Sequence, residues 1–394
     1  MKKQQSRIWT KDFTMIVIAN LFIFLAFQMS IPTLPLYVRE IGASERFIGL
    51  VVGIFTFSAL LVRPKAGQWI DSKGRAPVFL IGLIILTLST YSLAVSFTIL
   101  ILLVVRVVQG VGWGLSNTAS GTVASDLVPR DRRGEGLGYF GLSGNIALAI
   151  GPALGLFLVD YISFQWLFVI CGILTMFALL LALTVKYPKL EVHSDDDEKY
   201  EVAPPRFDFV EKKALPASTL LLFITLAFGG IATFLPAFTF ERGFESHYIQ
   251  IYFVIYAFAL LITRLFAGQL YDRKGLTIVF VPGAVSIIIA MILLAQLWNP
   301  AMLFTAAVLY GLGFGSIQPA LQAWAVNSAP NNRRGMANAT YFSAFDLGVG
   351  CGAILFGFVA EVFPYSMIYY LSAASVTVAL ILFIIMRSRN KQSA

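Results

Sequence analysis

Charged residues are scarce in this chain of 394 residues: Asp, Glu, Lys and Arg make up only 13% of it, whereas 58% is hydrophobic. A soluble domain carries about 25% charged residues, so this chain has too few polar side chains to cover a water-exposed surface. It also has only two cysteines and two histidines, which excludes a disulfide framework and a zinc site. No nucleophile–base pair or phosphate-binding loop is found, so we expect neither an enzyme nor a cofactor.

Long apolar runs take up most of the sequence. A membrane-spanning helix needs about 20 mainly apolar residues, and twelve segments meet this requirement. Their approximate ranges are 13–38, 46–70, 77–96, 98–124, 135–159, 163–185, 216–239, 247–270, 277–297, 301–325, 336–360 and 364–386. The sequence therefore predicts an all-α membrane protein with twelve transmembrane helices.

The few charges are unevenly placed. Most of the 29 Lys and Arg lie in the two tails, in the 186–215 linker and in alternate loops. Lys and Arg are enriched on the cytoplasmic side of membrane proteins, so we predict that both termini are cytoplasmic. This topology accounts for the net charge of +8 without a nucleic-acid partner. We expect a bacterial inner or plasma membrane protein that functions as a monomer in the lipid bilayer.

The sequence repeats itself at a fixed offset of 201 residues. The aligned residues are mainly Gly, Pro and charged residues. Examples of such pairs are Pro35 and Pro236, Arg63 and Arg264, Gly67 and Gly268, Asp71 and Asp272, and Gly110 and Gly311. We therefore predict two pseudo-symmetric six-helix halves, 1–185 and 216–394, joined by a linker at 186–215. Two such halves are typical of alternating-access transporters, which bind their substrate between the halves.

A polar motif follows the second predicted span. It runs from Gly67 to Arg75 and contains Asp71 and Gly74. Gly67 lets two helices approach closely, and Gly74 can adopt the backbone of a tight turn. The motif resembles the signature loop of the major facilitator superfamily, and the resemblance covers the whole chain, with a weaker copy of the loop in the second half. It implies the major facilitator fold, in which an acid at the position of Asp126 pairs with the motif and latches the outward-facing state.

Arg106 begins a second motif, Arg-Val-Val-Gln-Gly-Val-Gly, which looks like the helix-4 motif of the same family. Arg106 lies inside the predicted span 98–124, well away from its ends. A charge at such a depth costs at least ~2.5–3.5 kcal/mol on insertion scales, so Arg106 should face a cavity or a partner. One interpretation is that Arg106 tunes proton or substrate binding. The alternative is structural: its side chain extends toward the membrane surface or bonds a helix carbonyl. Gln109, Trp113 and Asn117 follow at steps of three and four residues, and we expect them to line the cavity beside it.

Gly151, Pro152 and Gly155 form a third motif in the fifth span. It is similar to the antiporter signature of proton-coupled exporters, with Ala147 in place of the first glycine and Leu156 in place of the last. Pro152 removes one helix hydrogen bond, and the small residues allow another helix to pack closely. The resemblance implies export, whereas the alternative is an ordinary packing face.

Asp346 lies near the middle of the eleventh span, and its partner in the repeat is Asn145. Ionisable groups at this depth are costly and usually functional. We predict that Asp346 carries the coupling proton or forms a counter-charge for a cationic substrate. The alternative is a neutral, hydrogen-bonded structural residue.

Further cavity residues are expected on the spans that line the central cavity in the family. They are polar or aromatic, namely Gln28, Phe234, Tyr310 and Gln318.

Taken with the resemblance, these features predict a secondary active efflux transporter of the drug:proton antiporter-like branch. It would use the proton gradient to export amphipathic drugs or small metabolites. The alternatives are a dedicated exporter of one metabolite, such as a sugar or a metallophore, a proton-coupled symporter, and a transceptor or lipid-handling protein.

Overall fold

The computed structural model describes residues 8–129, 132–187, 210–330 and 334–392. Twelve helices in this part of the chain are long and apolar enough to cross a membrane, which confirms the predicted all-α membrane fold. The helices of the first half are α1 (Lys11–Glu40), α2 (Glu45–Lys73), α3 (Arg75–Leu93), α4 (Ile99–Leu127), α5 (Arg133–Val159) and α6 (Phe164–Thr184). Those of the second half are α7 (Leu215–Glu241), α8 (Ser246–Lys274), α9 (Leu276–Ala295), α10 (Pro300–Ser328), α11 (Arg334–Val362) and α12 (Ser366–Gln392), preceded by the short η2 (Lys212–Ala214).

Each predicted span falls on one helix, although several helices are longer than predicted. The largest extension is at the end of α12, which continues to Gln392. Helical backbone is not confined to the apolar core, so polar ends such as this one stay helical beyond the apolar window that defines a span. Several helix starts carry a side-chain cap: Thr10 Oγ1 accepts from Phe13 N at 3.2 Å, and Asn299 Oδ1 accepts from Met302 N at 2.9 Å.

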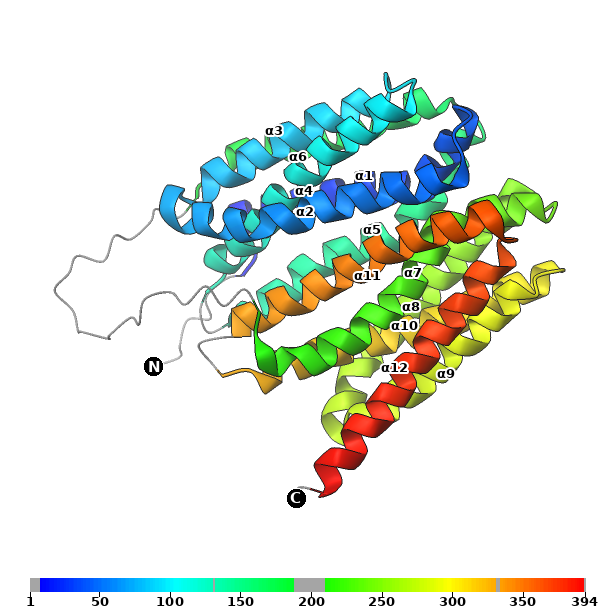
Figure 1. Ribbon diagram of the computed structural model, residues 1–394. Coiled ribbons are helices and arrows are strands. Elements are labelled where there is room, and N and C mark those ends of the chain that lie inside the picture. The colour runs from blue at the N-terminus through cyan, green and yellow to red at the C-terminus, as the bar shows by residue number, and fades with distance from the viewer. Residues whose placement is uncertain (1–7, 130–131, 188–209, 331–333, 393–394) are drawn as a thin grey trace.

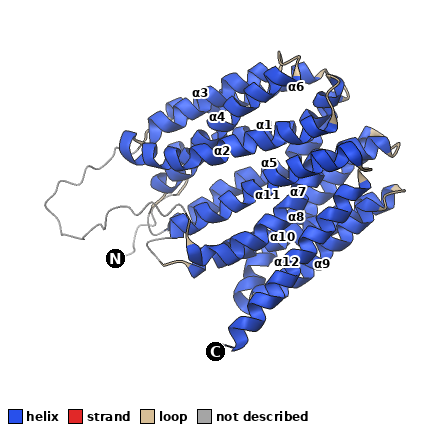
Figure 2. Ribbon diagram, in the orientation of Figure 1, coloured by secondary structure: helices blue, strands red, loops and turns tan. Residues whose placement is uncertain are grey.

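Helices α1–α6 form one bundle and α7–α12 form a second one beside it (Figure 1; Figure 2). The two bundles meet along α2 with α11, along α5 with α8, and along α1 with α7. Because each half has an even number of helices, α1 begins and α12 ends at the same end of the molecule, which we call the termini side. The other end is called the opposite side.

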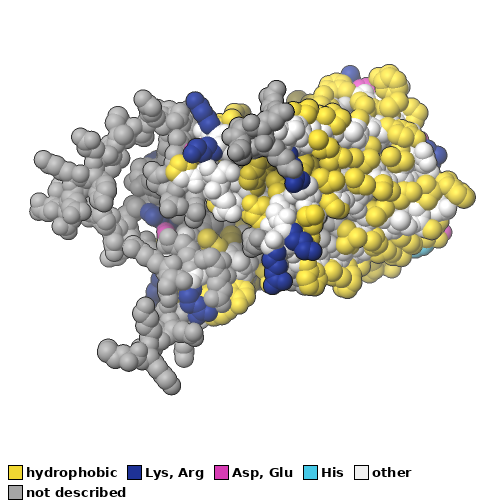
Figure 3. Space-filling model, turned by 90° about the horizontal axis from the view of Figure 1, so that it is seen from below, with side chains coloured by type: hydrophobic (Ala, Val, Ile, Leu, Met, Phe, Trp, Pro, Cys, Tyr) yellow, Lys and Arg dark blue, Asp and Glu magenta, His cyan; other side chains and the backbone are white. Residues whose placement is uncertain are grey.

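The surface fits a lipid environment. Hydrophobic side chains cover most of the described part of the face seen in Figure 3, and Lys and Arg gather toward the termini side. Long apolar side chains such as Leu61, Leu100 and Phe258 are 67–75% exposed, which water alone would not favour. Polar side chains therefore concentrate between the helices and at the two ends.

Candidate functional site

An ion pair joins the two halves inside the membrane-spanning region. Arg63 Nη2 on α2 lies 2.7 Å from Asp346 Oδ2 on α11, and the two side chains remain 22% and 19% exposed. Asp346 is therefore compensated within the protein, by a partner from the other half of the chain. The residual exposure leaves room for water, and thus for a proton, to reach the pair.

The second interface between the halves holds the matching residues of the repeat. Arg264 on α8 donates from Nη1 to Asn145 Oδ1 on α5 and from Nη2 to Gln318 Oε1 on α10 at 2.8 Å. Arg264 stands 201 residues after Arg63, and Asn145 stands 201 residues before Asp346. Each interface thus has an arginine facing an oxygen acceptor of the other half, but the acceptor is an acid, Asp346, at the α2–α11 interface and an amide, Asn145, at the α5–α8 interface.

On the opposite side, the halves are tied together by Arg39 at the end of α1. Its guanidinium donates to the hydroxyl of Tyr365 and, at 3.5 Å, to the carbonyl oxygen of Ala237, both in the second half. Its Nε pairs with Glu45 Oε1 at 2.8 Å, which fixes the side chain in place.

Two further contacts close the same side. Arg46 Nε lies 3.7 Å from Glu361 Oε1, which joins the start of α2 to the end of α11. Gln250 Nε2 donates to Asp160 Oδ2 at 2.6 Å and joins α8 to α5. The α2–α11 and α5–α8 pairs are therefore both held at their ends on the opposite side.

Glycines bring α2 and α11 into backbone contact near that side. A Cβ on Gly49 would lie 2.2 Å from the carbonyl oxygen of Ala353, and one on Gly53 would lie 2.3 Å from Ile354 Cγ1. Gly67 follows Arg63 by one turn on the same face of α2, yet a Cβ on Gly67 would meet nothing within 4 Å. The two helices therefore separate between Arg63 and Gly67, toward the termini side.

The second interface separates in the same direction. Gly141 lies one turn of α5 before Asn145, and Gly138 lies two turns before it. Both glycines are therefore on the face that meets α8. A Cβ on either glycine would meet nothing within 4 Å. The described part of the chain is thus closed on the opposite side and open toward the termini side.

A small cavity of about 40 Å³ lies between the halves, beneath the closed side. It is lined mainly by apolar residues of α1, α2, α7 and α11, and Arg106 is the charged residue in its wall. A cavity of this size holds about three ordered waters, so it is too small for a complete substrate. Arg106 is itself only 4% exposed.

Neutral partners surround Arg106. Its Nε donates to the carbonyl oxygen of Val51 at 2.9 Å, and its Nη1 donates to Gln109 Oε1 at 2.6 Å. Gln109 in turn donates to Thr90 Oγ1 at 3.0 Å, and the guanidinium lies 4.1 Å from the ring centroid of Phe55. Arg106 therefore faces a cavity and also bonds a helix carbonyl, so both contacts expected for it are present, and a role in proton or substrate binding stays a prediction.

The other residues predicted to line the cavity lie in different places. Trp113 stacks on Phe27 at 4.2 Å between centroids, and Phe27 lines the cavity. Gln28 is 7% exposed and packs against Gly151 rather than facing the cavity, and Asn117 is half-buried on α4.

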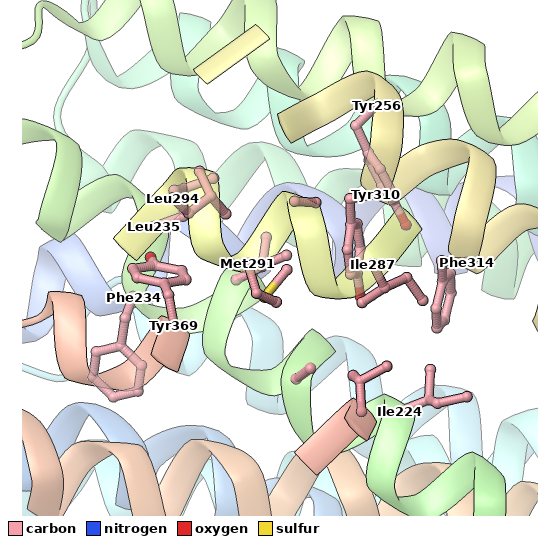
Figure 4. Packing of buried hydrophobic residues seen from close by; sticks show 14 of the residues in the cluster. Ile224, Phe234, Leu235, Tyr256, Ile287, Met291, Leu294, Tyr310, Phe314 and Tyr369 are labelled. Carbon is pink, nitrogen blue, oxygen red and sulfur yellow. The ribbon is translucent and has the colours of Figure 1, made fainter. Parts of the chain in front are cut away.

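Phe234 and Tyr310 are buried within the second half. Both have 0% exposure, and Figure 4 shows them among the side chains of α7–α10 and α12, with Tyr310 beside Tyr256 and Phe314. In this conformation they belong to the hydrophobic core of the half and do not line the central cavity.

The predicted loop motif joins two helices of one half. Arg75 Nε at the start of α3 donates to Asp126 Oδ2 at the end of α4, at 2.8 Å. Gly74 connects α2 to α3 with a φ of +95°, a backbone conformation that other residues rarely adopt. The side chain of Asp71 lies outside the described residues. The pair Arg75–Asp126 therefore braces the termini side of the first half, whose partner half is separated in this conformation.

The predicted antiporter motif holds α5 against α1. A Cβ on Gly151 would lie 2.6 Å from Gln28 Cβ, and one on Gly155 would lie 2.4 Å from the carbonyl oxygen of Met29. Pro152 lies between them inside the helix. The motif is thus a close packing surface, and this contact alone does not indicate a direction of transport.

Sequence reasoning did not identify Arg63 and Arg264 as partners of Asp346 and Asn145. The repeat contains the signal that was needed, because the two arginines match each other at the same offset as the aspartate and the asparagine. In two halves related by a pseudo-two-fold axis, matched residues that face one another across one interface also face one another across the other.

Two six-helix bundles with a charged, one-sided closure between them define a multi-pass membrane transporter. The sequence profile of the Major Facilitator Superfamily matches residues 16–339 and 217–394, so the chain belongs to that family.

Individual relatives are distant but span the whole chain. The uncharacterized MFS-type transporter YhhS of Escherichia coli K12 is 29% identical, over 93% of this chain and 90% of its own. The staphylopine export protein of Staphylococcus aureus Mu50 is 24% identical, over 94% of each chain. The fold is also that of a variant of the nucleoside transporter NupG, with a TM-score of 0.76 at 17% identity over 95% of this chain and 99% of that one.

Proposed function

We propose that this protein is a proton-coupled exporter that exchanges protons for amphipathic drugs or small metabolites by alternating access. The observation that carries the proposal is the ion pair between Arg63 and Asp346, which is part of the contact between the halves. Protonation of the carboxylate removes one of the two charges and therefore weakens a contact that must break whenever the halves rearrange.

The size of this effect is comparable to the free energy that coupling requires. Removing one partner of a buried ion pair costs about 3–5 kcal/mol, because the other charge is left without compensation. Shifting a two-state equilibrium from 1:99 to 99:1 needs about 5.5 kcal/mol. A proton on Asp346 therefore supplies a large part of the bias between two conformations, whereas the neutral Asn145 at the other interface does not change with pH.

The proposed direction of transport and the proposed membrane topology rest on other observations. The predominance of Lys and Arg at the termini side supports a cytoplasmic location for both termini, so the present conformation is inward-facing. The antiporter-like motif and the export function named for the staphylopine relative support export. Both halves of one chain line the cavity, which supports a functional monomer in the inner or plasma membrane. Arg75, Asp126 and the adjacent motif then form the cytoplasmic latch of the outward-facing state.

Inverted membrane vesicles provide the test. Vesicles with an acidic interior are loaded with a fluorescent pH probe, and amphipathic drugs and small organic acids are added one by one. Exchange of a lumenal proton for an added compound should restore fluorescence in vesicles with the wild-type protein. The response should be absent from vesicles with Asp346→Asn protein at equal abundance. An equal response of the variant would exclude Asp346 as the proton carrier, and the lack of any response in the wild type would contradict antiport.

A further inference from the structure

The charge balance inside the membrane-spanning region is strongly positive. Away from the helix ends, the described residues include the cations Arg63, Lys65, Arg106 and Arg264 and a single acid, Asp346; Lys65 is exposed. Asp346 is already committed to Arg63 across the α2–α11 interface. Arg106 and Arg264 therefore keep their charges without a carboxylate partner among the described residues.

Arg106 differs from Arg264 in where its unused donor lies. Arg264 leaves its buried Nε without a hydrogen-bond partner, whereas Arg106 uses Nε and Nη1, and its Nη2 bonds to no described residue. Of the two arginines, only Arg106 lines the cavity between the halves. The flat face of the Arg106 guanidinium is covered by Phe55. The free donors are therefore at the edge of the group, which lines the cavity between the halves.

The surroundings of that edge define a ligand. A buried guanidinium with only neutral partners attracts an anion, and a planar carboxylate is its best-matched acceptor. The remaining wall is mainly apolar, and its polar exceptions are the hydroxyl groups of Ser30 and Thr56. Besides Phe55, the apolar lining residues are Phe27, Ile31, Leu34, Val52, Phe228, Ala232 and Val349.

Size sets how the ligand is placed. The cavity of about 40 Å³ has room for a small head group but not for a whole substrate. On α2, its lining residues Val52, Phe55 and Thr56 lie between Gly49, where the halves touch, and Gly67, where they are apart. The head group of a ligand would thus sit at Arg106, and its apolar body would extend toward the open side.

We propose that the cavity at Arg106 is the anion-binding subsite of this transporter and that its substrates are small organic acids with an aromatic or apolar body and a single carboxylate. This inference rests on the proposed transport function, because it assigns the substrate class of the same central path. It places a negative cargo opposite Arg106, whereas Asp346 handles the proton.

Binding to the purified full-length protein in detergent tests the proposal without any gradient. Radiolabelled 2-naphthoate is bound in a scintillation proximity assay and displaced by unlabelled 2-naphthoate, by the isosteric neutral 2-naphthamide, or by sodium chloride. We expect the acid to displace the label at a concentration at least tenfold lower than the amide, and chloride to displace it weakly. Equal potency of the acid and the amide would overturn the proposal, and so would full displacement by chloride at the concentration that is effective for the acid.

Variants locate the effect. Arg106→Gln should abolish the preference for the acid over the amide, and Arg106→Lys should preserve it in part because the charge remains. Arg242→Gln, at the exposed C-cap of α7, removes an arginine far from the cavity and should behave as the wild type. An acid preference that survives in Arg106→Gln would refute the site. A protein that binds 2-naphthoate through Arg106 but fails the vesicle assay would contradict proton antiport and leave the anion subsite standing.

Discussion

Two glycines on one face of α2 should respond in opposite ways to the same substitution. Gly49 touches α11 where the halves are closed, and Gly67 faces open space where they are apart. Replacing either glycine by leucine adds the same side chain and a similar gain in helix propensity, up to about 1 kcal/mol. The difference between the variants therefore reports the contact between the halves.

The contacts of Gly49 give the magnitude. A Cβ at this position would lie 2.2 Å from the carbonyl oxygen of Ala353, which is backbone and cannot rotate away. Overpacking of this kind costs about 1–3 kcal/mol, which changes an equilibrium by about 5- to 150-fold. Gly49→Leu should therefore shift the protein away from the present conformation by that factor.

Gly67→Leu adds no clash in the present conformation, since nothing lies within 4 Å of its Cβ position. Closing the termini side would bring this face of α2 toward α11, where close approach of two helices requires small residues. The substitution should therefore favour the present conformation and slow transport, with normal protein abundance.

Spin-label distances measure both shifts in a background without the two native cysteines. One pair, at Ser72 and Asn327, spans the termini side, and a second pair, at Val95 and Trp298, spans the opposite side; all four positions are exposed. Gly49→Leu should shorten the first distance and lengthen the second. Gly67→Leu should hold the first distance at its long value under conditions that shorten it in the wild type. A shift in the same direction for both variants would refute the account of which side is open.

Three further predictions concern the other contacts. Asp346→Asn should abolish proton-dependent transport. Adding Asn145→Asp should restore part of it, because the acid then faces Arg264 at the other interface. Proton uptake in vesicles measures both variants, and full activity of the single variant would contradict the coupling role. Arg75→Gln should shorten the lifetime of the alternate conformation in single-molecule fluorescence traces, because it weakens the latch of that state; an unchanged or longer lifetime of the alternate conformation would disprove the latch. Gly155→Val should cost about 1–3 kcal/mol through its clash with α1 and lower the melting temperature in detergent; an unchanged melting temperature would show that α5 can move away.

The fold was predictable because several independent features of the sequence indicate it. Twelve apolar segments and a repeat at a fixed offset each require a helical bundle in two halves. The positions of Gly74 and Arg75 were likewise visible, since a motif fixes its own local structure. Pairings across the halves were not, because they depend on helix rotation and on the distance between bundles.

Phe234 illustrates the limit. The sequence places it on a helix that faces the cavity in the family, yet a rotation of part of a turn puts it into the core of the second half. Asp346 illustrates the converse, since its depth was predictable but its partner was not. Arg63 looked like an ordinary charge near the end of a span until the interface between α2 and α11 was in view.

The uncompensated charge of Arg106 has an electrical consequence. If the protein exports a monoanion in exchange for a proton, as proposed, each cycle moves one negative charge outward and one proton inward, which amounts to two positive charges entering the cell. Each charge is worth about 2.3 kcal/mol per 100 mV of membrane potential, so the voltage alone supplies about 4.6 kcal/mol per cycle at 100 mV. A transporter that moves two charges per cycle would work at neutral external pH, where the proton gradient is small, because the membrane potential drives it. It would stop when the membrane is depolarised at that pH.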